Sequence, residues 1–177
     1  PVGTPEMNDM YFPFANFNAH AADGSTSTVS DTFEVDVIAT EGFFFTSVIL
    51  ITQGDYNITG TPGENSVEAT GVLTTTSTVG TPFVGANTYT FLDDQPTDGN
   101  VFWEGSTWVD VPWMSFPPDE QVTELHVTVD QDVITICGPG GTADMTAYFE
   151  IVGISFVPEP ASLLLLTVGG LVLLRRR

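Results

Sequence analysis

A short acidic stretch, DDQPTDGNVFWEG, places several oxygen-bearing side chains around Gly99. Carboxylate and amide oxygens are the ligands that Ca²⁺ prefers in proteins. The spacing differs from that of an EF-hand, because Pro96 stands at a ligand position and the last Glu falls one residue early. The stretch is therefore a candidate calcium site, and the simpler alternative is a solvated acidic loop. The candidate ligands are Asp93, Asp94, Asp98, Asn100 and Glu104.

Three tryptophans, Trp103, Trp108 and Trp113, follow among Gly, Pro and acidic residues. Indole rings stack on sugar rings, and neighbouring carboxylates bind sugar hydroxyls. Exposed and roughly coplanar indoles would therefore indicate a carbohydrate-binding surface. The alternative is that these side chains fill the space between two sheets or cover its end.

The residues that could carry catalysis form no recognisable pattern. Two carboxylates can hydrolyse a glycosidic bond, but among 23 acidic side chains some pair always looks suitable. The sequence contains no G-x-S-x-G elbow, no P-loop and no metal-binding spacing of His20 and His126. We predict that the chain is not an enzyme.

The single cysteine, Cys137, excludes an internal disulfide. It ends a β-rich run, where a free cysteine is usually a small buried apolar residue. The alternative is an intermolecular bridge. The other acidic pair, Asp130 and Asp132, is a weaker calcium candidate and more simply indicates a hairpin turn.

The charge of the chain excludes several classes of function. It has 23 Asp and Glu against 3 Lys and Arg, and all three basic residues stand at the very end. Nucleic-acid binding and phosphoryl transfer both need Lys or Arg against phosphate, so both are excluded for residues 1–174. The carboxylates must find their counter-charges in solvent cations, bound metal ions or a partner, and the simplest interpretation is a solvated acidic surface.

Apolar and polar residues alternate from Asp31 onward, as in TFEVDVIA and VTELHVTVD. A period of two is typical of strands with one buried face. The apolar run from Phe43 to Ile51 predicts a central strand buried on both faces, and GDYNITGTPGEN predicts the turn after it. Eight or nine short strands, with no helical period before Ala161, predict an all-β, jelly-roll-like antiparallel sandwich over residues 1–156.

The last residues have a different character. Ala161 to Leu174 form an uncharged apolar run, which predicts a single C-terminal hydrophobic helix of about 21 Å. This length is below the ~30 Å of a bilayer core, so we expect Phe156 and Val157 to extend it and the terminal arginines to snorkel to the far headgroups. Arg175, Arg176 and Arg177 should remain cytoplasmic, which places the acidic domain outside the cytoplasm.

The sequence VPEPAS, the apolar run and the terminal arginines together resemble the PEP-CTERM sorting signal, over residues 157–177. The resemblance implies export, transient membrane insertion and recognition by an exosortase. Pro158, Glu159 and Pro160 would be the recognition motif and the three arginines the membrane stop. We expect this motif to be an exposed, extended linker, because Pro158 and Pro160 lack backbone N–H donors.

Together these patterns predict an exported protein at the cell surface or in an extracellular matrix. The expected role is structural or adhesive, in a matrix of extracellular polysaccharide. The alternative from another class is a carbohydrate-binding module, with calcium as an optional cofactor, and a glycan-active hydrolase is a further alternative. The resemblance also implies a signal peptide, which we expect to have been removed.

Overall fold

The computed structural model describes residues 6–13, 17–115 and 121–158. The predicted C-terminal helix, Glu159, Pro160, Arg175, Arg176 and Arg177 lie outside the described residues. The described part of the chain forms nine strands and one short 3₁₀ helix, η1. They are β1 (Glu6–Pro13), β2 (Asn18–Ala22), β3 (Thr26–Ile38), β4 (Phe43–Thr59), β5 (Ser66–Val79), β6 (Val84–Asp93), β7 (Val101–Asp110), η1 (Trp113–Ser115), β8 (Glu124–Ile136) and β9 (Thr142–Pro158).

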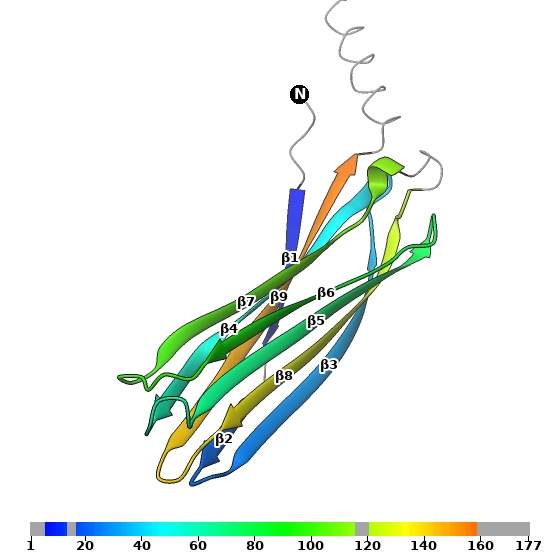
Figure 1. Cartoon of the computed structure of the whole chain (residues 1–177). Helices are drawn as coiled ribbons and strands as arrows, with labels where there is room; N and C mark the ends of the chain where they lie inside the picture. Colours follow the sequence, from blue (N-terminus) through cyan, green and yellow to red (C-terminus); the bar gives the residue numbers. More distant parts are fainter. Residues whose placement is uncertain (1–5, 14–16, 116–120, 159–177) are drawn as a thin grey trace, which may run out of the picture.

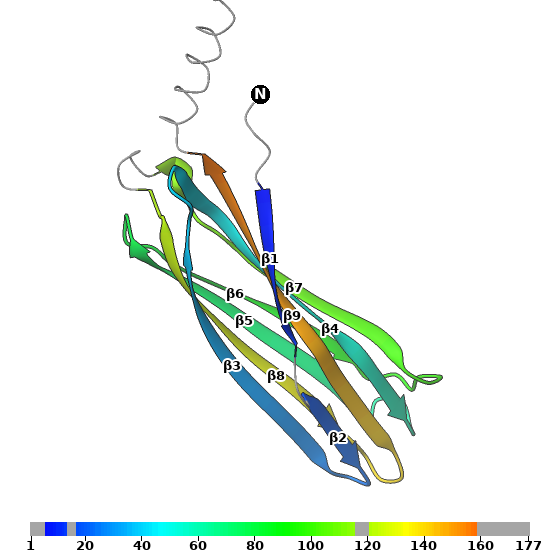
Figure 2. The ribbon, with the colours of Figure 1, turned by 180° about the vertical axis from the view of Figure 1, so that it is seen from behind.

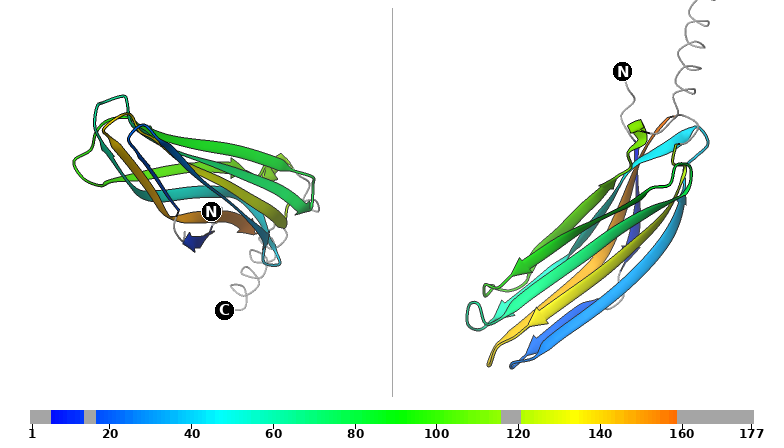
Figure 3. Two further views of the ribbon diagram at one scale, coloured as in Figure 1. Left: turned by 90° about the horizontal axis from the view of Figure 1, so that it is seen from below. Right: turned by 45° about the vertical axis from the view of Figure 1, so that its right-hand side comes forward.

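The strands form two facing antiparallel sheets (Figure 1). The first has the order β1-β9-β4-β7, with β2 pairing β9 beyond the end of β1, and the second has the order β3-β8-β5-β6. Figure 2 shows β1 and β2 along β9, and the view from below in Figure 3 shows the two layers. The predicted all-β antiparallel sandwich is confirmed.

The core lies between the two layers because each strand turns one face inward. In β4, Val48, Leu50 and Ile58 are fully buried, whereas the residues immediately beside each of them in the strand are partly buried or exposed. In β8, Leu125 and Val127 alternate with exposed or half-buried polar residues in the same way. This period of two is what the sequence pattern predicted.

Several predicted boundaries were wrong, always because strands are longer than their apolar runs. β4 continues to Thr59 through the predicted turn, with one face buried and one partly open. Asp130 and Asp132 are not in a hairpin turn but lie on the outer face in the middle of β8. The N-terminal region before Asp31 contributes β1, β2 and the start of β3. Cross-strand hydrogen bonding does not depend on side-chain polarity, so polar segments paired as readily as apolar ones.

The end of β9 corrects the interpretation of the tail. Phe156 and Val157 belong to this strand and pair with Phe45 and Phe44 of β4, and Pro158 pairs with Phe43. Phe156 also meets Phe43 edge-to-face, with ring centroids 5.5 Å apart. The first residue of the sorting motif is therefore the last residue of the sheet rather than part of a free linker. Neither Phe156 nor Val157 can extend a helix while β9 is formed.

Tyr89 of β6 spans the interior between two glycines. A Cβ atom at Gly71 would lie 2.2 Å from the Tyr89 ring, and one at Gly105 would lie 2.1 Å from the opposite edge of the same ring. Because both edges are confined, the ring cannot shift away from either position. Glycine is required at these two positions because the Tyr89 ring leaves no room for a side chain, and not because the backbone turns there.

We therefore expect Gly105→Ala to destabilise the protein by about 1–3 kcal/mol, the usual cost of overpacking a rigid core. Urea unfolding followed by tryptophan fluorescence measures the change. Ser106→Ala, one residue along on the exposed face of β7, is the matched control and should leave the midpoint within error. Equal midpoints for the two variants would contradict the confinement of Tyr89.

Candidate functional site

A polar layer crosses the interior of the sandwich at one level. In the second sheet, strand pairing aligns Tyr89, Gly71, Gln131 and Asp31 in one row. In the first sheet it aligns Gly105, Thr52 and Glu150. Tyr89 and Gln131 exchange hydrogen bonds of 2.7 and 2.9 Å, and the hydroxyl of Thr52 donates to Gln131 Oε1 at 3.1 Å.

Glu150 is the exceptional member of this layer. Its side chain is fully buried, and neither carboxyl oxygen has a hydrogen-bond partner among the described residues. Burial, with a smaller effect from the negative charge of Asp31, raises the pKa of Glu150 to about 8. The carboxyl group is therefore mostly protonated at neutral pH, which avoids a buried charge.

The sequence analysis missed Glu150, although a signal was present. In YFEIVGISF the glutamate has the same parity as Val152 and Ile154, which face the core. Its buried position leaves it no access to a substrate, so it is a structural feature of the interior and not a catalytic site.

The structure does not gather the predicted calcium ligands. Asp93 accepts hydrogen bonds from the Tyr56 hydroxyl and the backbone N–H of Gln95, which hold the pKa of Asp93 below its usual range. Glu104 accepts a hydrogen bond of 2.5 Å from Gln53. Asp94, Asp98 and Asn100 lie in or beside the exposed β6–β7 connection. Within the described ranges, no three His, Cys, Asp or Glu side chains are grouped closely enough to hold a metal ion.

The three tryptophans also lie apart. Trp103 points inward from β7, with 1% of its surface exposed, and its indole N–H donates to the Thr146 carbonyl at 3.1 Å. Trp108 points outward from the same strand and is 56% exposed. Trp113 is in η1, against Phe44. The three indole rings therefore form no common binding surface. The alternative prediction, that these side chains fill the space between the sheets, holds for Trp103. Cys137 is buried, as expected, and is unpaired within the chain.

A different surface combines aromatic and polar side chains. It lies on the outer face of the first sheet, at the end opposite Pro158. Strand pairing places Phe102, Asp55, Thr146 and Asn18 in one row across β7, β4, β9 and β2, and aligns Asn57, Asp144 and His20 in the next. We call this surface the distal patch: Asn18, His20, Asp55, Asn57, Phe102, Asp144, Thr146 and Tyr148.

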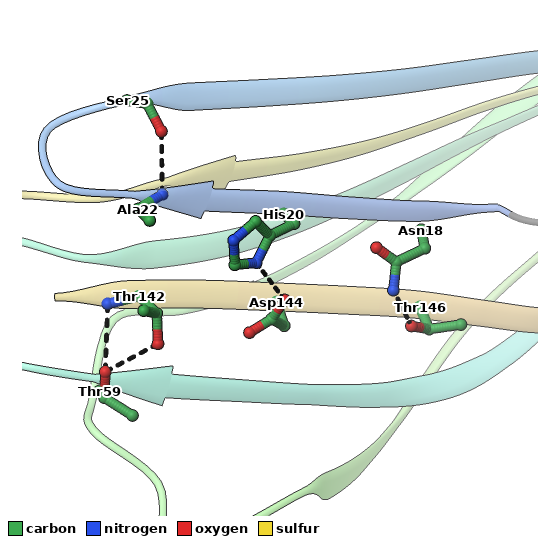
Figure 4. A network of polar contacts seen from close by, with 8 residues as sticks. All are labelled: Asn18, His20, Ala22, Ser25, Thr59, Thr142, Asp144 and Thr146. Atoms are coloured by element: carbon green, nitrogen blue, oxygen red, sulfur yellow. Dashed lines mark hydrogen bonds and ion pairs between the residues drawn. The ribbon is translucent and has the colours of Figure 1, made fainter.

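Hydrogen bonds between strands hold the polar part of the distal patch (Figure 4). The Asn18 amide donates to the Thr146 hydroxyl at 2.7 Å, and His20 Nδ1 donates to Asp144 at 2.5 Å. Each bond joins β2 to β9, so β2 completes the patch. The groups are therefore fixed before any ligand arrives, which reduces the entropy cost of binding.

An aromatic side chain stands on each side of Asp55. Tyr148 lies at an irregularity in the β4–β9 pairing, where the register shifts, and its hydroxyl donates to Asp55 at 2.5 Å. This bond raises the pKa of Tyr148, so the phenol stays neutral. Phe102 pairs with Asp55 from the other side and is 60% exposed. A hollow of about 50 Å³ lies here, lined by Asp55, Tyr56, Asn57, Asn100, Asp144, Thr146 and Tyr148.

Comparison with family models concerns the other end of the chain. Residues 156–177 match the model of the PEP-CTERM protein-sorting motif. The tail carries a PEP-CTERM sorting motif. The PEP-CTERM motif implies export and membrane-anchored processing by an exosortase, and its match begins inside β9. Among the described residues, no helix has the length and apolarity to cross a membrane.

No curated protein matches the chain in sequence. A chain in the structure of infectious bursal disease virus, Gx strain, is 11% identical, with a TM-score of 0.34; the match covers 92% of this chain and 42% of the viral chain. Eiger TNF from S. frugiperda is 11% identical over 81% of this chain and 93% of its own, with a TM-score of 0.29. A family 16 carbohydrate-binding module is 11% identical over 78% and 74%, with a TM-score of 0.26. Likenesses at this level assign no activity to the chain.

The buried carboxyl group makes stability depend on pH. Because the folded state holds the Glu150 proton up to a pKa of about 8 while the unfolded chain releases it near 4.5, the contribution of Glu150 to stability is fully present below pH 4.5 and is lost as the pH rises toward 8. Glu150→Gln removes this loss. Relative to the wild type, the variant should gain about 2.5 kcal/mol in unfolding free energy between pH 5 and pH 7.

Urea titrations at the two pH values measure this difference. Glu41→Gln, which removes one exposed carboxylate from the β3–β4 turn, controls for the general effect of charge and should follow the wild type. A Glu150→Gln protein whose stability changed with pH as the wild type's does would show that Glu150 is ionised in the fold.

Proposed function

We propose that this chain is an exported, non-catalytic surface protein that holds extracellular polysaccharide on its distal patch. The observation that carries the proposal is the arrangement around Asp55, where the exposed aromatic side chains of Phe102 and Tyr148 lie beside fixed hydrogen-bonding groups. Sugar rings present apolar C–H faces and polar hydroxyl edges, and a surface of aromatic rings with carboxylate and amide groups complements both.

The charge of the chain favours a neutral glycan. The formal net charge is −20, and no Lys or Arg precedes Arg175. An anionic polysaccharide would be repelled by this field at low salt, and the described residues offer no cluster for a bridging metal ion. Hydroxyl groups, in contrast, can both donate to Asp55 or Asp144 and accept from Asn18 or Asn57.

The topology suits a passive binding role. Sequential strands from β3 onward are distributed over two sheets in the order β3-β8-β5-β6 and β9-β4-β7, the arrangement of a jelly roll with two Greek keys. Such a closed sandwich presents rigid faces, on which side chains keep their spacing. A polysaccharide could therefore be held by its shape without any rearrangement of the protein.

The proposal includes that the chain catalyses no reaction. A glycosidase would need two reachable carboxyl groups on either side of a cleft, one with a raised pKa. Among the carboxyl groups of the described residues, Glu150 has the clearly raised pKa, and it is closed inside the sandwich. The PEP-CTERM motif would then deliver the domain to the cell surface or matrix, where binding alone is needed.

The test is binding of neutral polysaccharide to the chain and its variants, by affinity electrophoresis in gels that contain the glycan. Phe102→Ala should weaken binding about tenfold, a loss of about 1.4 kcal/mol, because one stacking face is removed. Trp108→Ala is the matched control, since Trp108 is an exposed aromatic on the same face of β7, six positions further along.

Equal retardation of the Phe102→Ala and Trp108→Ala proteins would exclude the distal patch as the binding surface. Retardation by anionic polysaccharide alone would contradict the neutral class of ligand. Hydrolysis of the glycan by the wild-type chain, abolished by a substitution in the patch, would overturn the non-catalytic role.

A further inference from the structure

The end of the sandwich where β9 stops carries exposed apolar side chains. Ile38 ends β3 and is 70% exposed, and Val84 begins β6 and is 71% exposed. Val79, at the end of β5, is partly exposed as well. Strand pairing aligns Ile38 and Val79 on either side of Glu124, so they lie in one row. We call this region, with Pro158, the tail end.

An apolar pocket lies beside Ile38. It has a volume of about 200 Å³ between β1, β3, β4 and β9. Its lining is almost wholly apolar: Met10, Val37, Ile38, Ala39, Thr40, Phe45, Ile154 and Phe156. The two sheets therefore part slightly at the tail end, and their apolar interior is reachable there. In water such a surface is unfavourable, and a contiguous apolar surface usually marks a contact.

The length of chain beyond β9 determines what can cover this surface. From Pro158, held in the sheet, to Ala161, the first residue of the apolar run, there are three residue steps. Three extended steps reach at most about 11 Å. The headgroup layer on one side of a bilayer is itself about 5–8 Å thick. If the apolar run enters the membrane, the end of β9 is thus drawn to the headgroups.

The short apolar run strengthens this constraint. Ala161 to Leu174 would span about 21 Å as a helix, less than the ~30 Å hydrocarbon core. Phe156 and Val157 cannot lengthen it, because β9 holds both in the sheet. The mismatch can be met by thinning the bilayer, by snorkelling of the three terminal arginines, or by drawing the tail end inward, and the last of these brings β9 closest to the lipid.

From these observations we propose that the tail end docks on the lipid surface, with Ile38, Val79 and Val84 in the headgroup layer, while the chain awaits processing. This inference rests on the exported surface role of the proposed function and on the membrane-anchored processing that the PEP-CTERM motif implies. Docking would remove the largely exposed side chains of Ile38 and Val84 from water, which is favourable for apolar groups.

The lipids that fit are zwitterionic. Glu41, Glu124 and Asp36 lie at the same end of the sandwich, and anionic headgroups would repel them. His126 is the basic group that faces this cluster from the described strands, and it is already engaged by Asp36 at 2.7 Å. The docked orientation also directs the distal patch away from the membrane. Thr146 and Pro158 are twelve residue steps apart along β9, or about 40 Å.

The test uses the full chain in dioleoylphosphatidylcholine vesicles, with Cys137→Ala as background. An environment-sensitive fluorophore is attached to Val84→Cys or to Leu92→Cys, and lipids with a nitroxide near the acyl carbonyl serve as quenchers. Leu92 is the matched control, because it is 64% exposed on the same face of β6 but at its other end. We expect several-fold greater quenching at position 84 than at position 92, and no change in glycan retardation.

Equal quenching at the two positions, in protein that floats with the vesicles, would overturn docking and leave the anchoring intact. Protein that fails to float would overturn docking together with its premise, the insertion of the tail. An unquenched label at position 84 that becomes shielded only when exosortase is present in the vesicles would assign the tail end to the enzyme instead of the lipid. Circular dichroism of each labelled protein checks that the fold is retained.

Discussion

The pairing of β4 with β9 is the constraint on which the rest of the structure depends. Each strand is 17 residues long, and their antiparallel register runs from Phe43–Pro158 to Thr59–Thr142. On the inner side this register places Thr52 against Glu150 and so creates the polar layer. On the outer side it aligns Asp55 with Thr146 and Asn57 with Asp144. At its end it holds the first proline of the sorting motif in the sheet.

The scarcity of positive charge explains how this fold is stabilised. With no Lys or Arg among the described residues, the carboxylates there can pair only with histidine. His20 meets Asp144, and His126 meets Asp36 and Glu34. Since exposed ion pairs contribute little, stability comes from the strand ladders and the apolar core. The same scarcity leaves buried Glu150 without a cation, so it stays protonated instead of forming a buried ion pair.

The two ends of the sandwich differ in a way that gives the molecule a direction. The distal patch is polar and aromatic, and its groups are already held by hydrogen bonds between strands. The tail end is apolar and leads, within a few residues, into the hydrophobic run. Anchoring at one end and polysaccharide binding at the other, as we propose, would fit a surface protein. The two paired sheets fix the distance between these two ends.

The sequence by itself determined the strand class, the sorting tail and the excluded functions, because each depends on local pattern or on composition. The alternation of apolar and polar residues in TFEVDVIA predicts a strand with one buried face, whatever its position in the sheet. The three arginines can be located at the end of the chain from the sequence alone, without knowledge of the fold. The tertiary structure alone decided which polar residues meet. Asp55 and Tyr148 are 93 residues apart, and His20 and Asp144 are 124 apart. Asp93 and Asp98 are close in the sequence and therefore suggested a calcium site. Strand register, and not proximity along the chain, decides which side chains share a face of the sheet.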